Sequence, residues 1–231
     1  MWCKLKSVVS QATLNRLVAR IDLQSQLPSD SETFVKTFFL DGQGGVANID
    51  LLRYLHLELW PQMRDKVDFK APAIDHASLL FKKAGAPGTG LHQDRPYWFG
   101  REKTPSIFSV WIALEDISRK KGCLKLSSSN ELDASQMSNF HKGTLIKHDN
   151  IPNATGGFPL LISGSDAQEI QRTMRFVELK KGECVAFDSF EPHMSTENQT
   201  GSPRLAMKIA YCEGDGKARN LISVDKLEAG I

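Results

Sequence analysis

The sequence predicts a mainly β protein, a sandwich or jelly roll with helices from the N-terminal part packed against one of its sheets. Two observations support this fold class. Apolar residues recur at three- and four-residue intervals in two segments before Pro61, which is typical of amphipathic helices. From about His76 onward the apolar period changes to two, and Gly, Pro, Ser and Asn separate short strand patterns. Helices followed by strands differ from the alternating order that builds a parallel sheet.

Two helices are expected in the first part of the chain. The first spans Ser10 to Leu23, and Ser10 or Thr13 is suited to cap it. Its apolar positions are Leu14, Leu17, Val18 and Ile21. The second helix follows Asn48, and its apolar positions are Ile49, Leu52, Leu55 and Leu59. Pro61 ends this second pattern because proline has no backbone N–H to donate.

Six later segments have the pattern of short strands. They are residues 77–83, 106–114, 122–127, 175–179, 183–188 and 204–212. Between the third and the fourth, residues 128–173 show no sustained period and contain several glycines and prolines, and loops of this length are usually lids, binding loops or disordered segments. We therefore predict a single domain of residues 1–231. It has a helical part at about 1–70, a jelly-roll core at about 76–215 and a lid-like insertion at about 128–173.

Composition and charge argue against several classes of protein. The 231 residues carry a net charge of +2 with the signs scattered, so the basic stripe of a nucleic-acid binder is missing. No apolar run approaches the roughly 20 residues that cross a bilayer, and the first residues lack the apolar block of a secretion signal. The four cysteines lie far apart, which argues against a disulfide framework. We expect a cytoplasmic protein with neither nucleic acid nor membrane as partner.

Three residues have the types and spacing of a metal site. His92 and Asp94 are two residues apart, so on an extended strand both side chains project from the same face. His193 lies beyond most of the strand region and supplies a second imidazole. Two histidines and one carboxylate that leave coordination positions free are typical of non-haem Fe(II) oxygenases. Zinc accepts the same ligands, so the metal stays open at this point.

Arg204 begins a strand whose alternate residues are Ala206, Lys208 and Ala210. Small neighbours on that face leave space for a ligand. A guanidinium facing such a space can hold a carboxylate through two parallel hydrogen bonds, which a lysine cannot do. The strand therefore predicts a site for a carboxylate-containing molecule.

Several motifs in order resemble the phytanoyl-CoA dioxygenases, a family within the Fe(II)- and 2-oxoglutarate-dependent oxygenases. The resemblance covers about half of the chain. It lies in Leu80–Gly85, Leu91–Trp98, Trp111–Asp116 with Gly122-Cys123-Leu124, and Lys181–Arg204. It implies a double-stranded β-helix, the cupin-like form of a jelly roll.

The resemblance also implies roles for single residues. His92, Asp94 and His193 are the expected iron ligands and catalytic centre, and Arg204 is expected to pair with the distal carboxylate of 2-oxoglutarate. Ser195 would assist Arg204. Gln93 and Trp111 match positions that lie near the cosubstrate in similar proteins. Lys82 matches a strand position before the metal motif whose role varies in the family, and it is a further candidate for binding the cosubstrate. One departure is clear, since family members often continue the Gly-Cys-Leu strand into Pro-Gly-Ser-His, whereas this chain has Leu126-Ser127-Ser128-Ser129-Asn130.

Substrate contacts are expected beside the iron motif. Tyr97 and Trp98 follow it directly and are candidates for the wall of a substrate pocket, although aromatic residues of this kind also pack in cores. Arg95 could meet an acidic group of the substrate or lie at the surface. Four histidines receive no role from the sequence: His56, His76, His141 and His148.

The function expected from these features is a dioxygenase that uses Fe(II), 2-oxoglutarate and O2 to oxidise a small-molecule metabolite, releasing succinate and CO2. Because Asp94 keeps its carboxylate, hydroxylation, desaturation or oxidative dealkylation is expected rather than halogenation. The alternatives are a non-catalytic jelly-roll protein that binds a metal or ligand, and a zinc hydrolase that uses the same ligands. The sequence indicates neither the substrate nor the oligomeric state.

Overall fold

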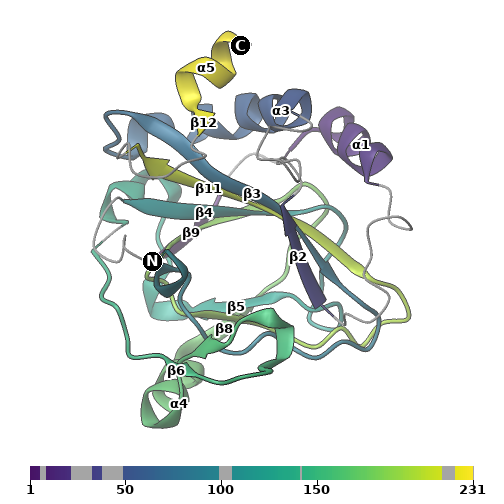
Figure 1. Cartoon of the computed structure of the whole chain (residues 1–231), viewed down its shortest axis with the longest axis vertical. Coiled ribbons are helices and arrows are strands. Elements are labelled where there is room, and N and C mark those ends of the chain that lie inside the picture. Colours follow the sequence, from purple (N-terminus) through teal and green to yellow (C-terminus); the bar gives the residue numbers. More distant parts are fainter. Residues whose placement is uncertain are drawn as a thin grey trace.

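The structure, a computed structural model, describes residues 1–5, 9–21, 33–37, 49–98, 106–140, 142–214 and 222–230, with backbone alone for 33–37. Of the residues singled out above, His141 lies outside these ranges. Two antiparallel sheets face each other, and the helices lie outside them (Figure 1). The mainly β, jelly-roll prediction is therefore confirmed.

The large sheet has seven described strands, all antiparallel to their neighbours. Six of them run in the order β1 (Trp2–Lys4), β9 (Cys184–Asp188), β4 (Ile107–Ala113), β11 (Arg204–Glu213), β3 (Pro72–Lys82) and β12 (Ile222–Ser223). The seventh, β2 (Thr33–Thr37), also pairs with β3. The second sheet contains β10 (His193–Ser195), β5 (Leu124–Ser127) and β8 (Met174–Val177). All six strands expected from the sequence are present, with ends shifted by a few residues.

Both expected helices form, and they cover the outer face of the large sheet (Figure 1). Helix α1 (Gln11–Arg20) is capped by Ser10, whose side chain accepts a hydrogen bond from the backbone of Thr13. Helix α3 is Ile49–Leu59, and a 3-10 turn that contains Pro61 follows it. Their leucines pack against the outward-facing apolar residues of β3, β4, β9 and β11. A further helix, α5 (Val224–Ala229), lies beside α3. No helix among the described residues has the length and apolar content needed to cross a bilayer.

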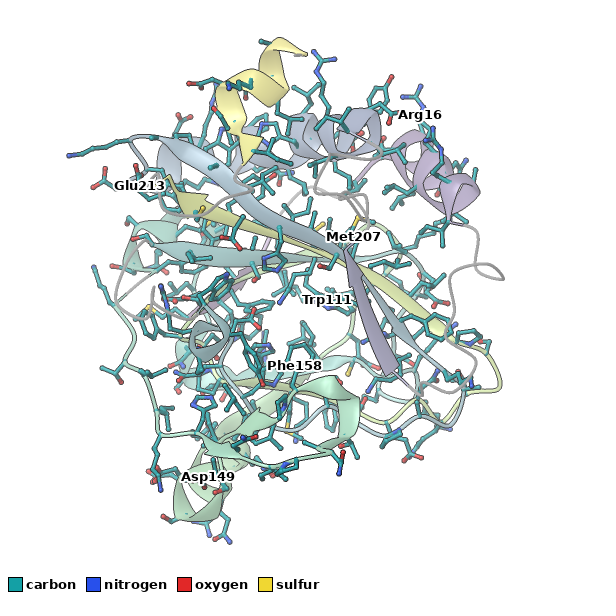
Figure 2. All side chains as sticks on the ribbon, in the orientation of Figure 1. Arg16, Trp111, Asp149, Phe158, Met207 and Glu213 are labelled. Carbon is teal, nitrogen blue, oxygen red and sulfur yellow. The ribbon has the colours of Figure 1, made fainter. Side chains whose placement is uncertain are left out.

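The register of the large sheet arranges polar side chains on its inner face. Lys82 pairs with Arg204 at one end of the β3–β11 ladder, and Ser78 pairs with Lys208 further along it. On the other side of β11, Trp111 of β4 pairs with Lys208. Paired residues project from the same face of a sheet, so these side chains point toward the smaller sheet. Figure 2 shows Trp111 in the space between the two sheets.

Residues 128–173 lie outside both sheets, as expected from their lack of period. They form a hairpin of β6 (Asp149–Asn150) and β7 (Leu160–Leu161) and three 3-10 turns at Ser128–Asn130, Ala134–Asn139 and Thr155–Gly157. They also contain α4 (Gly164–Thr173), a regular helix that the sequence analysis did not identify. This region carries Phe158 into the space between the sheets (Figure 2). Its role as a lid stays a prediction.

Candidate active site

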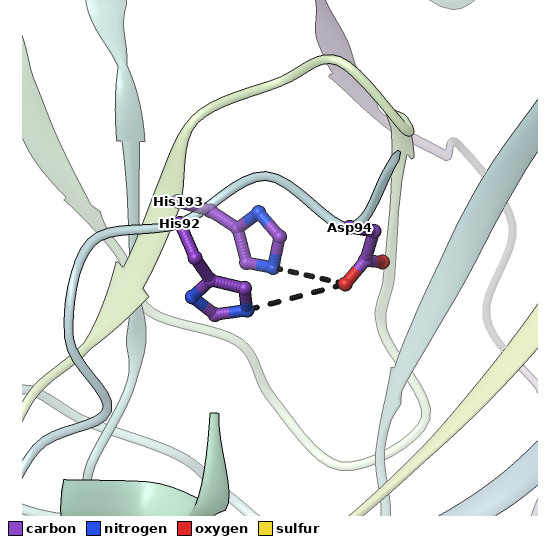
Figure 3. A group of neighbouring side chains, drawn as sticks. All are labelled: His92, Asp94 and His193. Atoms are coloured by element: carbon purple, nitrogen blue, oxygen red, sulfur yellow. Dashed lines mark ion pairs between the residues drawn. The ribbon is translucent and has the colours of Figure 1, made fainter. Parts of the chain in front are cut away.

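His92, Asp94 and His193 come together between the two sheets. His92 and His193 form an isolated antiparallel bridge in which each backbone N–H donates to the other residue's carbonyl oxygen, at 3.0 and 2.8 Å. Asp94 does not continue the extended strand expected from the sequence: its backbone is helical (φ −70°, ψ −31°), and it is the N-cap residue of the 3-10 helix Arg95–Tyr97. Its Oδ1 lies 4.0 Å from His92 Nε2 and 3.7 Å from His193 Nε2 (Figure 3). Each of the three residues offers one possible metal-ligand atom, and these three atoms lie within 4.8 Å of one another.

The ring orientation and protonation of both histidines suit metal binding. His92 Nδ1 donates to the carbonyl of Gly90 at 2.8 Å, and His193 Nδ1 donates to the carbonyl of Glu191 at 2.9 Å. A carbonyl only accepts, so each Nδ1 carries the hydrogen and each Nε2 keeps its lone pair. Burial lowers the pKa of both rings, and for His92 burial together with His193 lowers it to about 3. Both imidazoles are therefore neutral at physiological pH, the form that binds metals.

Asp94 is held as a carboxylate by two residues behind it. Its Oδ2 accepts hydrogen bonds from Lys208 Nζ at 3.0 Å and Ser109 Oγ at 3.1 Å. Burial alone would raise the pKa of Asp94, but the positive charge and the hydrogen bond of Lys208 oppose this, and the pKa lies below its usual range. Oδ1 is left facing the imidazoles. The strand pattern puts Lys208 on the same face as Arg204, but no sequence motif marks Lys208 or Ser109 as part of the site.

Arg204 faces the same cavity as the three candidate ligands. The cavity encloses about 50 Å³, and its lining includes Trp111, Ser195 and Arg204. Arg204 is buried, donates to the carbonyl of Gly122 at 3.1 Å and lies 5.5 Å from the centre of the Trp111 ring. Its Nε has no hydrogen-bond partner, and no described carboxylate pairs with it. Burial lowers its pKa to about 10, so it stays charged at neutral pH. A buried cation without an anion is suited to receive a carboxylate ligand.

Lys82 and Ser195 stand at the Arg204 end of this cavity. Lys82 Nζ donates to Ser195 Oγ and to the carbonyl of Thr196, both at 3.1 Å, and to the carbonyl of Pro87 at 2.7 Å. Ser195 Oγ also accepts from the backbone of Thr89 at 3.1 Å. Burial and the nearby Arg204 lower the pKa of Lys82 to about 7. Ser195 thus lines the cavity, and Lys82 supports it from behind.

Gln93 and Arg95 project away from this cavity. The Gln93 side chain donates to the carbonyls of Thr144 and Phe190 and accepts from the backbone of Ile146 at 2.9 Å, so it anchors the chain at 144–146. The Arg95 guanidinium is buried 4.5 Å from the centre of the Phe190 ring. The expected contacts of Gln93 with the cosubstrate and of Arg95 with the substrate stay predictions.

Tyr97 and Trp98 line a second cavity of about 360 Å³. Tyr97 OH exchanges hydrogen bonds with the backbone of Leu160, and its ring meets Phe158 edge-on at 5.4 Å. Phe158 stacks on His92 with ring centres 4.6 Å apart and lines both cavities. No local pattern marked Phe158, because its position depends on how residues 128–173 fold back.

The remaining described histidines differ in their surroundings. His56 is buried in the helical core, where Nδ1 lies 3.2 Å from Tyr211 OH. His148 Nε2 accepts from the backbone N–H of Gln93 at 3.0 Å. His76 lines the second cavity.

Fold and site together define a jelly-roll protein with a buried two-histidine, one-carboxylate cluster. The family model described as phytanoyl-CoA dioxygenase (PhyH) matches residues 5–206, so the chain belongs to the phytanoyl-CoA dioxygenase family. The peroxisomal phytanoyl-CoA dioxygenase of Homo sapiens is 30% identical over 125 residues, which are 54% of this chain and 33% of that protein. The rat protein matches over 180 residues at 29% identity, covering 74% of this chain and 48% of its own length. The chain thus spans between a third and a half of these relatives.

Solved structures with the same fold are more distant in sequence. The epimerase SnoN, in complex with Fe3+, alpha ketoglutarate and nogalamycin RO, superimposes with a TM-score of 0.64 at 17% identity, covering 92% of this chain and 78% of its own. EctD from S. alaskensis, with 2-oxoglutarate and 5-hydroxyectoine, superimposes with a TM-score of 0.61 at 14% identity, covering 92% and 72%. At these identities the likeness shows the fold.

Proposed function

We propose that the protein is a non-haem Fe(II)- and 2-oxoglutarate-dependent dioxygenase that oxidises a small molecule. One observation carries the proposal. The buried Arg204, which has no anion partner among the described residues, faces the cavity that also receives His92, Asp94 and His193. A metal alone would explain the three ligands but not this cation. Family membership and the named complexes of SnoN and EctD support the same assignment.

The residues present fit an iron ion and its cosubstrate. His92 Nε2, His193 Nε2 and Asp94 Oδ1 would hold the metal and leave positions free, as in oxygenases of this ligand type. Arg204 would hold the distal carboxylate of 2-oxoglutarate, with Ser195 beside it and Trp111 along the cavity wall. When bound, iron, 2-oxoglutarate and O2 supply the oxidation: one oxygen atom ends in succinate with release of CO2, and the other is available to the substrate.

The protein's own contribution is to position the ligands and to exclude water. Lys208 and Ser109 orient Asp94, and two backbone carbonyls orient the histidine rings. Apolar side chains, Leu80 and Phe187 among them, line the cavity. Because Asp94 completes the ligand set, we expect hydroxylation, desaturation or oxidative dealkylation and not halogenation.

We propose further that residues 1–231 act as one domain in a reducing compartment such as the cytoplasm. The helices pack on the sheet that carries the site, which supports a single unit. All four cysteines are free and buried, which supports a reducing environment. Small-molecule substrates rather than nucleic acids or membranes are the expected partners, and localisation of a tagged full-length protein in its own cell tests the compartment.

Anaerobic spectroscopy tests the proposed activity. Fe(II) and then 2-oxoglutarate are added to metal-free protein, and the visible charge-transfer band of the chelate is recorded. We expect a band that is lost in His92→Ala and weakened in Arg204→Ala. A folded, iron-loaded protein without a band would favour a non-catalytic binding protein, and hydrolytic activity with zinc in place of iron would favour a zinc hydrolase.

A further inference from the structure

The second cavity adjoins the candidate iron site on the side away from Arg204. Asp94, Phe158 and Lys208 line both cavities, so these three residues form the wall between them. The larger space, about 360 Å³, lies on the side of Tyr97 and Trp98. A molecule held there would meet the metal site without occupying the Arg204 cavity.

A bulge in β3 turns two polar side chains into the second cavity. His76 pairs with Ala210, but the next pair in the ladder joins Ile74 to Tyr211, so Asp75 is an extra residue. Such an insertion breaks the alternation of faces, and both Asp75 and His76 line the cavity. Asp75 Oδ2 accepts from His76 Nδ1 at 2.9 Å and from Trp98 Nε1 at 3.0 Å. Since a carboxylate only accepts, His76 Nδ1 carries a hydrogen and Nε2 remains for another partner.

Lys208 brings positive charge to the wall between the cavities. Its ammonium has three N–H donors, and its hydrogen-bond partner among the described residues is Asp94 Oδ2. The carboxylates of the second cavity both have hydrogen-bond donors: Asp75 accepts from His76 and Trp98, and Asp94 Oδ2 accepts from Lys208 and Ser109. Asp94 Oδ2 accepts from one of the three ammonium donors, so two N–H donors of Lys208 have no acceptor among the described residues and are available to a ligand.

We propose that the second cavity binds the substrate and that the substrate is a small carboxylic acid. Its carboxylate accepts hydrogen bonds from Lys208, and its carbon skeleton packs against Phe158, Tyr97 and Trp98. This proposal rests on the proposed dioxygenase function. Lys208 contacts Asp94 Oδ2, and the other oxygen of the same carboxylate, Oδ1, faces the metal site. A substrate carboxylate bound to Lys208 therefore places its nearest carbon atoms closest to the iron, and these carbons are the ones oxidised.

Calorimetric titration tests the substrate class without turnover. Anaerobic protein saturated with Fe(II) and 2-oxoglutarate is titrated with straight-chain monocarboxylates from acetate to octanoate, with phenylacetate, and with the primary amide of each acid. We expect at least one acid to bind about tenfold or more tightly than its amide, since charge-assisted hydrogen bonds are the strong ones. Lys208→Met should abolish this preference, and Lys208→Arg should keep most of it. The visible iron–2-oxoglutarate band is recorded on every variant.

The outcomes separate the two proposals. If the wild type gives no band, the dioxygenase assignment fails. If the band is present but no acid binds, or each acid binds no better than its amide, the carboxylate proposal is overturned while the dioxygenase assignment stands. A preference for the acid over its amide that survives Lys208→Met would place the acid's carboxylate away from Lys208 and would also overturn it. If Lys208→Met fails to fold, the comparison of acid and amide binding to the wild-type protein still tests the proposal.

Discussion

Replacing Arg204 by methionine removes the guanidinium that we propose holds the distal carboxylate of 2-oxoglutarate. Methionine has an unbranched side chain like the stem of arginine, but it has neither the charge nor the donors of the guanidinium that lies 5.5 Å from the centre of the Trp111 ring. The guanidinium now donates to Gly122 and keeps Nε without a partner. We therefore expect a large loss of 2-oxoglutarate affinity without a comparable loss of stability.

The size of both effects follows from the burial of Arg204. Truncating one partner of a buried, hydrogen-bonded charge pair costs about 2–5 kcal/mol of binding. At about 1.4 kcal/mol per tenfold change, the affinity should fall roughly 30- to 5,000-fold. In the ligand-free protein burial lowers the pKa of Arg204 to about 10. Compared with a free guanidinium, whose pKa exceeds about 12, the unpaired charge therefore costs on the order of 3 kcal/mol.

Two assays check this expectation. The visible iron–2-oxoglutarate band gives the affinity, and thermal unfolding of the ligand-free protein gives the stability. Removal of the unpaired charge should offset the lost hydrogen bond to Gly122, so the unfolding temperature should hold or rise. Arg119→Met is the matched control, because Arg119 is an exposed arginine that lies over the Phe176 ring. An affinity within about threefold of the wild type would refute the assignment of Arg204.

Three further predictions concern the surroundings of the site. Asp94→Ala should lose stoichiometric Fe(II) binding, measured by metal analysis after desalting, while its circular dichroism spectrum stays that of a folded β protein; retained iron would contradict the ligand assignment. Because burial lowers the pKa of Lys82 to about 7, its positive charge is lost as the pH rises through that value. The 2-oxoglutarate affinity should therefore fall between about pH 6 and 8 in the wild type and change less in Lys82→Met, and equal slopes would exclude this role. Gly88→Ala should lower the unfolding temperature by several degrees, because the new Cβ would lie 2.4 Å from the backbone oxygen of Ser195; overpacking of this kind costs about 1–3 kcal/mol. Gly201→Ala, which meets nothing within 4 Å, should leave it unchanged, and equal effects of the two would refute the steric argument.

The elements that local patterns predicted are those with enough residues to show a period. Helices α1 and α3 and the strands β4 and β11 fall close to their expected bounds, whereas β3 begins at Pro72, five residues before its expected start at Ala77. Strand β1 has three residues and β10 has three, which is too short for an alternating pattern to be recognised. Both form because they find partners, β1 along β9 and β10 along β5.

Within the site, the chemistry of the expected ligands was readable from residue type and spacing, but the surrounding contacts were not. His92 and Asp94 share a short spacing, and the family motifs pointed to His193 and Arg204. In the sequence, Lys208 is an unmarked position on a strand whose neighbouring residues on the same face are small. Its contact with Asp94 requires the register that pairs β11 with both β3 and β4.

The sequence by itself determined which residues could form helices and strands, and which side chains could bind a metal and a carboxylate. These properties are local, since they depend on the period of apolar residues and on the donors and acceptors of each side chain. Only the tertiary structure decided that Phe158 covers His92, that Lys208 holds Asp94 and that a bulge turns Asp75 and His76 into a second cavity. Such contacts join residues far apart in the chain, and they exist because strand register and packing bring those residues to one place.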